Sequence, residues 1–339
     1  MYQFALVGCG RISKRHAENI QKVGRLKAVC DVIPERADAL ANEYNCTPYY
    51  TIDDLLKNET EIDIVSICTP NGYHAEHSIK SLQAGKHVLC EKPLCITSAA
   101  AWQMIETEKF CRRNLFVVKS NRYNPVLMQL KEAVDQGKLG CIYSFHLSCI
   151  WNRPEEYFTD WHGKLFPDGG ILYTQFSHYV DAMIGLFGEV DETKGLRKNF
   201  AHKNNVEFED TGVATLCMKN GCIGSLHWTV NAFNKNHEVA LTIVAEKGTI
   251  RIGGEYLNEV QYQSTENDIH FTTAQNIAND YLSYKGSISK HDEVYRHLIK
   301  ALTKTDTLFA NAYDGLRTVE TIEKIYKAVS LNSKNEMEK

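Results

Sequence analysis

The sequence predicts an α/β protein of two domains, in which a doubly wound parallel sheet is followed by an α+β domain with a large, mainly antiparallel open sheet. The chain has 339 residues, more than the roughly 250 to 300 at which a single hydrophobic core usually stops growing. Up to residue 121, short apolar runs alternate with amphipathic segments, as is typical of parallel strands joined by crossover helices. Longer strand-like runs separated by turns follow, so we place the domains at 1–121 and 122–339.

The first domain is predicted to contain five strands and four helices. The strands are the runs FALVG, KAVCD, IDIVSICT, HVLCE and LFVVKSN, whose nearly continuous apolar character is expected of strands buried on both faces. The helices are predicted over residues 11–23, 34–44, 74–84 and 98–112. Pro34 supports the second helix, because proline is favoured in the first turn.

The second domain is predicted to open with a helix over 125–136 and a strand over 141–151. A continuous helical pattern then covers 171–187. The strands that follow should form an antiparallel meander, and they are predicted at 208–218, 222–233, 238–246 and 248–252. Two helices, at 291–303 and 312–330, close the domain, and the tail at 332–339 should be frayed.

Composition argues against several classes of protein and partner. A formal net charge of -4 gives no broad basic field that would attract nucleic acid or a membrane surface. No apolar stretch approaches the roughly 20 residues of a membrane helix, and the first residues lack the pattern of a signal peptide. The eleven cysteines contain no CxxC pair and fall mostly in apolar runs, as expected of small buried side chains in a reducing compartment. We therefore expect a cytoplasmic protein without a disulfide framework.

A glycine motif follows the first predicted strand and predicts a dinucleotide site. Gly8, Gly10, Arg11 and Ile12 belong to a GxGxxS sequence, in which the glycines allow a tight turn and the close approach of a pyrophosphate. The anion then meets backbone N–H groups at the start of the next helix. Asp31 ends the second strand, where a carboxylate can accept from ribose hydroxyls and repel a 2'-phosphate. The sequence therefore predicts NAD as cofactor, in preference to NADP.

Polar residues follow two further strands of the predicted sheet. Ligands of open α/β sheets bind at the carboxyl ends of the strands, so we expect these side chains at the cofactor site as well. Those after the third and fourth predicted strands are Thr69, Pro70, Asn71, His74, Glu91 and Lys92.

Together these motifs resemble the Gfo/Idh/MocA family, named after glucose–fructose oxidoreductase, inositol dehydrogenase and a rhizopine-catabolism protein. The matching segments are GCGRIS, the acid Asp31, TPNGYH at 69–74 and above all CEKPL at 90–94. Two segments of the second domain, NRYNP and GGILYTQFSHYVD, are also similar to that family, so the resemblance covers nearly the whole chain. It implies a Rossmann domain that binds NAD, with Asn121 and Trp161 near the cofactor, and a second domain for substrate binding and for assembly into a dimer or tetramer.

Lys92 is the expected catalytic base. Oxidation of a secondary alcohol requires a base within hydrogen-bond reach of the hydroxyl group. Burial beside a cationic nicotinamide favours the neutral amine that a base must be, and Glu91 could orient it. A lysine after a strand is by itself more often a solvated surface residue, but its similarity to the family's EKP lysine favours the catalytic role.

His178 is expected to assist Lys92. On the predicted helix, Thr174, His178 and Asp181 recur at spacings of four and three and should share one face. Histidine can accept or relay a proton near neutral pH, although a histidine satisfied within the domain core is the plainer interpretation. Many relatives carry Asp where this chain has Thr174, and that departure places more of the base role on Lys92. Asp181 is expected to be structural.

The segment 151–170 is rich in Trp, Arg and Tyr, which suits a large anionic ligand, with packing at an interface as the alternative. The residues expected to contact substrate are Lys92, Arg122, Tyr123, Asn152, Arg153, Trp161, His162, Thr174, Gln175 and His178.

These residues are similar to those of the subfamily that oxidises UDP-N-acetylglucosaminuronic acid (UDP-GlcNAcA) at C3, as are FEDTG at 208–212, IGGEYLNEV at 252–260 and NDYLSYKGS at 279–287. The resemblance implies that Lys92 takes the hydroxyl proton and that NAD takes the hydride. It further implies that 2-oxoglutarate regenerates NAD and that the 3-keto product serves bacterial surface polysaccharide assembly.

Two other interpretations stay open. An inositol or free-sugar dehydrogenase of the same fold would act without a nucleotide and would not need Arg153 or Trp161. A non-enzymatic redox sensor that binds NAD would need no functional Lys92, although the presence of both the EKP motif and His178 argues against it.

Overall fold

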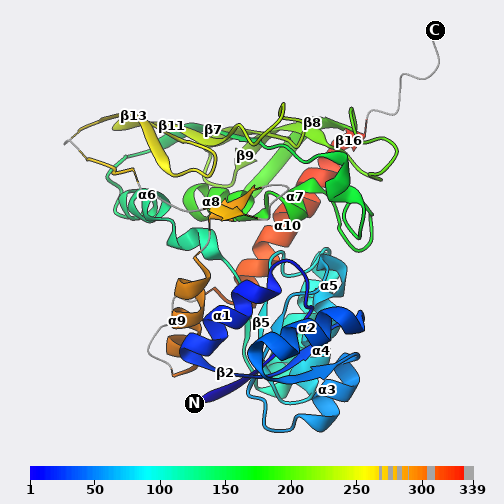
Figure 1. The fold of residues 1–339 in the computed structure, drawn as a ribbon. Coiled ribbons are helices and arrows are strands. Elements are labelled where there is room, and N and C mark those ends of the chain that lie inside the picture. The colour runs from blue at the N-terminus through cyan, green and yellow to red at the C-terminus, as the bar shows by residue number, and fades with distance from the viewer. Residues whose placement is uncertain (267–268, 274–277, 281–284, 289, 304–309, 332–339) are drawn as a thin grey trace. The chain divides into compact units, whose positions relative to one another are not determined.

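In a computed structural model the chain forms two compact units (Figure 1). The structure describes all residues except 267–268, 274–277, 281–284, 289, 304–309 and 332–339. Residues 281–284 of the NDYLSYKGS segment and the predicted frayed tail at 332–339 therefore lie outside the described residues. The first unit comprises Met1–Lys119 and Lys290–Val319, and the second comprises Ser120–Ser289 and Glu320–Lys339. Residues 290–319, which we placed in the second domain, pack with the first unit because the helix at their start lies against the first helix of the chain.

The first unit is built on a six-stranded parallel sheet in the order β3-β2-β1-β4-β5-β6. The strands are β1 (Tyr2–Val7), β2 (Gly24–Cys30), β3 (Thr47–Tyr49), β4 (Ile64–Ile67), β5 (His87–Cys90) and β6 (Leu115–Val117). The five predicted strands are present, and β3 was missed because its three residues include a proline and form no apolar run. Strand order reverses between β1 and β4, which is the point where open α/β sheets bind their ligands.

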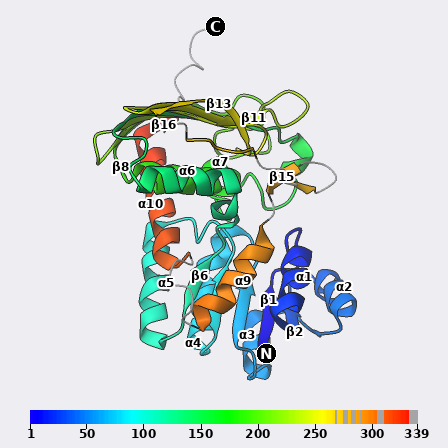
Figure 2. The same cartoon turned by 90° about the vertical axis from the view of Figure 1, so that its left-hand side faces the viewer.

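Helices cover the sheet of the first unit. They are α1 (Ser13–Val23), α2 (Pro34–Tyr44), α3 (Ile52–Asn58), α4 (His74–Gln83), α5 (Ser98–Cys111), α9 (His291–Leu302) and the first part of α10 (Ala312–Ala328). Helix α9, orange in Figure 2, packs against α1, whereas α4 packs against α3 and α5. The four predicted helices are confirmed, and the short α3 was missed although Thr51 caps it by accepting the N–H of Asp54.

The second unit is built on an eight-stranded mixed sheet in the order β13-β12-β11-β7-β10-β9-β8-β16. Its strands are β7 (Ile142–Ile150), β8 (Val190–Lys198), β9 (Thr211–Met218), β10 (Ile223–Thr229), β11 (Glu238–Ala245), β12 (Gly248–Gly253), β13 (Glu259–Thr265) and β16 (Val329–Leu331). A separate pair of short strands, β14 (Ala278–Asp280) and β15 (Lys285–Ile288), lies outside this sheet.

The predicted antiparallel meander is wrong at one place. Strand β7 lies between β10 and β11 and runs parallel to β10. Strands β10 and β11 are therefore not neighbours in the sheet, although they follow each other in the sequence. The register explains the insertion, because Leu147 lies opposite Leu226 and Cys149 opposite Trp228, so that the two strands turn buried side chains to the same face. Alternation along each strand predicts which face is buried but not which strands pair.

One face of this sheet is covered by helices α6 (Pro125–Asp135), α7 (Ile171–Thr174) and α8 (Ser177–Phe187), and no helix of the described part of the chain covers the opposite, open face (Figures 1 and 2). The predicted continuous helix over 171–187 is therefore wrong. It breaks at Phe176, whose φ and ψ of -115° and 5° are not helical and whose buried ring packs on Trp151. Thr174 thus lies on α7, and the argument that it shares a helical face with His178 and Asp181 fails.

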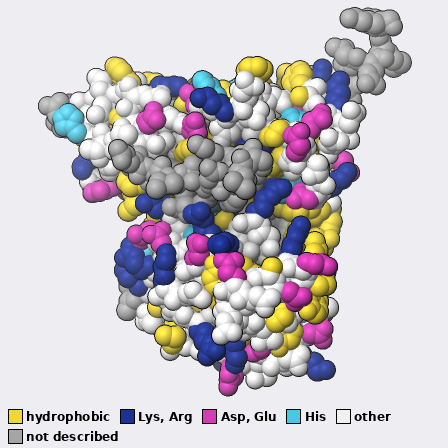
Figure 3. Space-filling view, in the orientation of Figure 1, with side chains coloured by type: hydrophobic (Ala, Val, Ile, Leu, Met, Phe, Trp, Pro, Cys, Tyr) yellow, Lys and Arg dark blue, Asp and Glu magenta, His cyan; other side chains and the backbone are white. Residues whose placement is uncertain are grey.

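Within the described residues, no helix combines the length and the apolar character that crossing a membrane would demand. Figure 3 shows basic and acidic side chains interspersed on the face it presents. That mixture agrees with the absence of a broad basic field in the composition.

Candidate active site

The glycine loop between β1 and α1 has the geometry that a dinucleotide requires. Gly8 has a φ of +98°, and a Cβ there would lie 2.6 Å from the carbonyl carbon and oxygen of Cys68, so a side chain is excluded. At Gly10 a Cβ would meet nothing within 4 Å, which leaves the backbone open to close approach. Helix α1 then begins at Ser13 without a side-chain cap. These features fit a pyrophosphate at the start of α1.

Asp31 lies directly beside this loop. Its Oδ2 accepts the N–H of Cys9 at 2.7 Å, and its Oδ1 accepts the N–H of Ile33 at 2.9 Å. The carboxylate is therefore held at the carboxyl end of β2, which is the position from which an acid can contact the ribose of NAD.

Replacing Asp31 with asparagine should reduce the preference for NADH over NADPH. The amide keeps an acceptor for Cys9 but carries no charge to repel a 2'-phosphate. We expect the ratio of the two dissociation constants to fall by about 10- to 100-fold, since hydrogen bonds to a charged group contribute about 1.5 to 3 kcal/mol. Fluorescence titration with each cofactor measures the ratio, and an unchanged ratio would show that Asp31 does not face the ribose.

His74 joins the two polar loops that follow β4 and β5. Its Nδ1 lies 2.7 Å from the carbonyl oxygen of Pro93, and its Nε2 lies 2.8 Å from that of Thr69. Burial lowers the pKa of His74, so the neutral ring donates to one of these oxygens and lies close to the other. The contact with Pro93 links the loop after β4 to the segment that carries Lys92. Asn71, in the same loop, is also buried. The contacts of His74 place it between the segment after β4 and the segment after β5.

Lys92 follows β5 and is half-buried, whereas its neighbour Glu91 is buried and turns inward. The Oε1 of Glu91 accepts from His16 at 2.8 Å and from His291 at 3.1 Å, and its Oε2 accepts the backbone N–H of Lys92 at 2.9 Å. Sequence reasoning missed both histidines. The two residues are far apart in the sequence and form no recognisable motif, because His16 lies on α1 and His291 lies on α9.

In the second unit, several predicted substrate residues form one buried cluster around Arg153. The guanidinium donates to Gln175 Oε1 at 2.7 Å, to the carbonyl oxygen of Asn152 at 2.6 Å and to Asn236 Oδ1 at 3.1 Å. It also lies 4.9 Å from the ring centroid of Trp151, within range of a cation–π contact. Arg153 is only 2% exposed, so its described contacts make it an organiser of this cluster.

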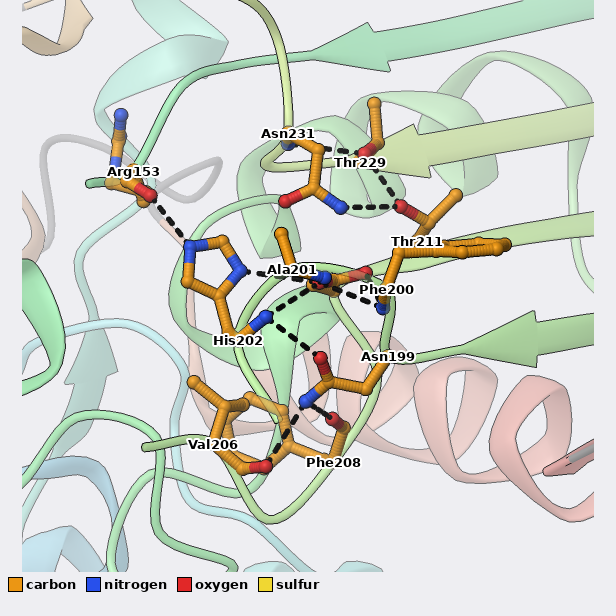
Figure 4. A network of polar contacts seen from close by, with 11 residues as sticks. Arg153, Asn199, Phe200, Ala201, His202, Val206, Phe208, Thr211, Thr229 and Asn231 are labelled. Carbon is orange, nitrogen blue, oxygen red and sulfur yellow. Dashed lines mark hydrogen bonds and ion pairs between the residues drawn. The ribbon is translucent and has the colours of Figure 1, made fainter. Parts of the chain in front are cut away.

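Asp210 of the FEDTG motif is linked to the same cluster through His202, whose contact with Arg153 is drawn in Figure 4. The Asp210 carboxylate accepts backbone N–H groups from Phe200 and Ala201 and lies 3.2 Å from His202 Nδ1. Burial would raise the pKa of Asp210, but these hydrogen bonds outweigh it and lower the pKa to about 2. The Nε2 of His202 lies 3.0 Å from the carbonyl oxygen of Arg153, so the loop after β8 is linked to the Arg153 cluster.

The aromatic segment 151–170 contributes further contacts to the second unit. Trp161 stacks on His162 with ring centroids 3.8 Å apart. The His162 ring also lies 4.3 Å from that of Tyr157, whose hydroxyl accepts from Gln175 Nε2 at 2.6 Å. The segment therefore brings the rings of Trp161 and His162 together, and Tyr157 links them to Gln175.

Thr174 does not stand alone in place of an acid, because its hydroxyl donates to the buried carboxyl group of Asp168. The other oxygen of Asp168 accepts the N–H of Gly163 at 2.8 Å. Asp168 is 1% exposed, and burial raises its pKa to about 7, with the hydrogen bonds from Thr174 and Gly163 offsetting part of the effect. Sequence reasoning missed Asp168, although the PDGG sequence before α7 placed an acid in this loop.

The raised pKa of Asp168 predicts a pH-dependent stability. Between the ordinary aspartate pKa near 4 and the folded value, the native protein holds a proton that the unfolded chain has lost. The contribution of Asp168 to the free energy of unfolding should therefore fall as pH rises from about 4 to 7, by on the order of a few kcal/mol. Denaturant unfolding across this range should show the fall in the wild type and lose it in Asp168→Asn. Parallel curves for the two proteins would contradict the assignment.

The remaining predicted residues of the second unit lie near the start of α8. Arg122 binds Asp181 through two hydrogen bonds of 2.8 and 2.9 Å, which confirms a structural contact for Asp181 and engages Arg122 inside the unit. His178 is 5% exposed on α8, three residues before Asp181. Asn121 is buried and Tyr123 half-buried in the short helix Ser120–Tyr123. Lys92 belongs to the first unit and His178 to the second.

Comparison with protein families decides the class. Residues 2–118 match the model described as an oxidoreductase family with an NAD-binding Rossmann fold, and residues 127–251 match the Gfo/Idh/MocA C-terminal domain. The chain belongs to the Gfo/Idh/MocA oxidoreductase family. The resemblance and the fold class expected from the motifs are confirmed, and the first unit of this family member is its NAD-binding Rossmann domain. The protein is an NAD-dependent dehydrogenase, which leaves the non-enzymatic sensor without support.

Solved structures of two relatives align over nearly the whole of this family member. The WlbA dehydrogenase from Bordetella pertussis, in complex with NADH and UDP-GlcNAcA, is 32% identical, with a TM-score of 0.86 and coverage of 96% of each chain. The WlbA dehydrogenase from Chromobacterium violaceum, in complex with the same two molecules, is 31% identical, with a TM-score of 0.87 and coverage of 98% of this chain and 97% of that one. Inositol 2-dehydrogenase from Rhizobium meliloti is 34% identical over 140 residues, which cover 41% of this chain and 42% of that enzyme.

Proposed function

We propose that this dehydrogenase oxidises the C3 hydroxyl group of UDP-GlcNAcA to the 3-keto sugar. The observation that carries the proposal is the similarity to two dehydrogenases whose structures contain NADH and UDP-GlcNAcA, at 31 to 32% identity over 96 to 98% of the chain. The aromatic and arginine-containing cluster around Arg153 supports it, because stacked rings and a buried cation suit a nucleotide-linked uronic acid.

Contacts within each unit support the proposed roles. When bound, NAD supplies the acceptor for the hydride that leaves C3. Lys92 accepts the hydroxyl proton at its Nζ, and its backbone is held by the hydrogen bond to Glu91. His178 assists that proton transfer from the start of α8. The Asp168–Thr174 pair supplies a second proton-holding group in the second unit, since the Asp168 pKa of about 7 lets the carboxyl group gain and lose a proton near neutral pH.

A turnover assay tests this function directly. The purified protein is incubated with UDP-GlcNAcA and 2-oxoglutarate, and 2-hydroxyglutarate and the oxidised sugar are measured by mass spectrometry. We expect both products in equal amounts, which would also support the proposal that 2-oxoglutarate regenerates NAD on the enzyme. Formation of the keto sugar with other hydride acceptors alone would retain the substrate and reject the recycling step. No product from UDP-GlcNAcA or related UDP-sugars would reject the function.

A second candidate, oxidation of inositol or a free sugar, is favoured by the 34% identity to inositol 2-dehydrogenase over 140 residues. It predicts NADH formation from myo-inositol or glucose without any UDP group. In that case Trp161→Ala should leave KM for the free sugar unchanged, whereas the nucleotide-sugar proposal predicts that it raises KM for UDP-GlcNAcA.

We also propose that the open face of the eight-stranded sheet pairs with another copy of the chain, giving a dimer or tetramer. Cross-strand register places Leu196 beside Val213, and Ile223 and Val244 lie on the same face. These four side chains are 40 to 57% exposed. They form two apolar pairs on one face of the sheet, Leu196 with Val213 and Ile223 with Val244 on either side of Ser144, and exposed apolar groups on one face are a feature of interaction surfaces. Light scattering on the purified protein checks the assembly, and a monomeric mass would exclude it.

The place of this reaction in the cell is part of the same proposal. All eleven cysteines are free thiols, as expected in the reducing cytoplasm. A 3-keto sugar nucleotide is a substrate for an aminotransferase, so we place the enzyme before a transamination in bacterial surface polysaccharide assembly. The product of that transamination would be used to make a diacetamido uronic acid. Loss of this sugar from the polysaccharide of a deletion strain would support that placement, and an unaltered polysaccharide would reject it.

A further inference from the structure

A buried chain of hydrogen bonds runs through the first unit to the residue before Lys92. The Ser66 hydroxyl lies 2.9 Å from that of Tyr295, which lies 2.8 Å from His16 Nδ1. His16 Nε2 then lies 2.8 Å from Glu91 Oε1, the oxygen that also accepts from His291 at 3.1 Å. All five side chains are buried. These hydrogen bonds thus link residues of β4, α9 and α1 to the carboxylate of Glu91, directly after β5.

The charge of this carboxylate is stabilised inside the unit. Burial by itself would raise the pKa of Glu91, but the hydrogen bonds from His16 and His291 outweigh it and hold the pKa well below its ordinary value. Burial lowers the pKa of His291, so this ring is a neutral donor to an ionised Glu91. With the N–H of Lys92, three donors converge on the two oxygens of Glu91. An ionised carboxylate is tolerated in a protein interior only when it is paired in this way.

The separations within the cluster favour hydrogen bonds over metal coordination. One ligand atom from each of His16, Glu91 and His291 lies within 4.8 Å of the others. Tetrahedral zinc with bonds of about 2.05 Å would hold its ligand atoms roughly 3.3 Å apart, whereas the two contacts to Glu91 Oε1 are 2.8 and 3.1 Å. Those are ordinary hydrogen-bond distances between a nitrogen donor and an oxygen acceptor, so the histidine N–H protons lie between the rings and Glu91.

We propose that His16 and His291 are positioning residues for Lys92, which clamp Glu91 and thereby fix the backbone that carries the amine. The proposal rests on the proposed function, because Lys92 is the base of that reaction. His16 lies one turn into α1, directly after the glycine loop, and His291 is the first residue of α9. The clamp therefore joins the helix that receives the pyrophosphate to the segment that carries the base.

The clamp is expected to act on the reaction rate more than on binding. The side-chain hydrogen bonds described for the two histidines go to Glu91 and Tyr295 and not to the glycine loop. Removing one donor would weaken the hold on Glu91 and let the 91–93 backbone shift. A displacement of about 1 Å at a reacting group can lower a rate by about 100-fold.

The test compares His291→Leu, which removes the donor, with His291→Gln, whose amide N–H₂ can still reach Glu91. Each variant is assayed for kcat and KM with UDP-GlcNAcA, for NADH affinity by fluorescence, and for hydrogen–deuterium exchange of the peptide that contains the Lys92 amide. For the Leu variant we expect kcat to fall about 100-fold with KM and NADH affinity nearly unchanged, and exchange at this peptide to become about tenfold faster. The Gln variant should restore both toward the wild type. If the Leu variant does not fold, His291→Asn, whose side chain ends short of Glu91, takes its place.

The outcomes separate this proposal from the proposed function. Equal kcat in the Leu and Gln variants, or a loss confined to NADH affinity, would overturn the positioning role. Unchanged exchange at the Lys92 amide would overturn the clamp whatever the substrate is, because exchange is measured on the holoenzyme without substrate. The function would be rejected if the wild type oxidised no UDP-sugar. The clamp would still be supported in that case if the Lys92 amide exchanged faster in the Leu variant but not in the Gln variant.

Discussion

Replacing Lys92 with methionine should lower kcat for the sugar nucleotide by about 1,000-fold and leave NADH affinity within a factor of about two. Methionine fills a similar volume but cannot accept a proton, so hydride loss from C3 would no longer be coupled to removal of the hydroxyl proton. The predicted cofactor site is built mainly from other groups, above all Gly8, Gly10 and Asp31, and those do not change. Stopped-flow absorbance of NADH formation, together with fluorescence titration, measures both quantities.

A matched control is available in the same unit. Lys57 is an exposed lysine near the end of α3, and Lys57→Met should leave kcat, KM and NADH affinity at their wild-type values. A Lys92→Met protein that keeps more than about a tenth of wild-type kcat would show that another group removes the proton.

Replacing His178 with asparagine should lower kcat by about 100-fold, the lower end of the range for a general acid or base. Asparagine keeps a polar side chain at this buried position of α8 but cannot change protonation state near neutral pH. If His178 assists the same proton transfer as Lys92, the double variant should be far less impaired than the product of the two single effects. Measuring all four proteins of the cycle under saturating substrate provides the coupling.

Multiplicative losses in that cycle would instead show that His178 acts in a separate step or only supports the fold. Thermal unfolding of the same four proteins distinguishes those two cases. A lowered midpoint in His178→Asn, with normal kcat for the folded fraction, would assign the histidine to the core.

The elements that the sequence predicts well are those with a long apolar signal. Strands such as β4 and β5 are buried on both faces and read as continuous apolar runs, so their position and their parallel pairing could be predicted. Short elements carry too little pattern, as β3 and α3 show. The place of β7 between β10 and β11 depends on pairing between distant strands, and alternation within one strand contains no information about that choice.

The site divides along the same line. The positions of the glycine loop, Asp31 and Lys92 at the carboxyl ends of strands could be predicted, because each follows a recognisable strand. The clamp of His16 and His291 on Glu91 could not, since its members come from α1, β5 and α9 and meet only in the folded unit. Asp168 was missed for a related reason, because the break at Phe176 moves Thr174 off the helix of His178 and turns it toward a loop acid.

Transfer of deuterium from the substrate tests the central claim most directly. UDP-GlcNAcA labelled with deuterium at C3 is incubated with the holoenzyme, and the mass of the NADH formed is measured. Hydride transfer from C3 predicts NADH that is heavier by one deuterium and a keto sugar that has lost its label. Unlabelled NADH with the deuterium retained in the oxidised sugar would contradict oxidation at C3.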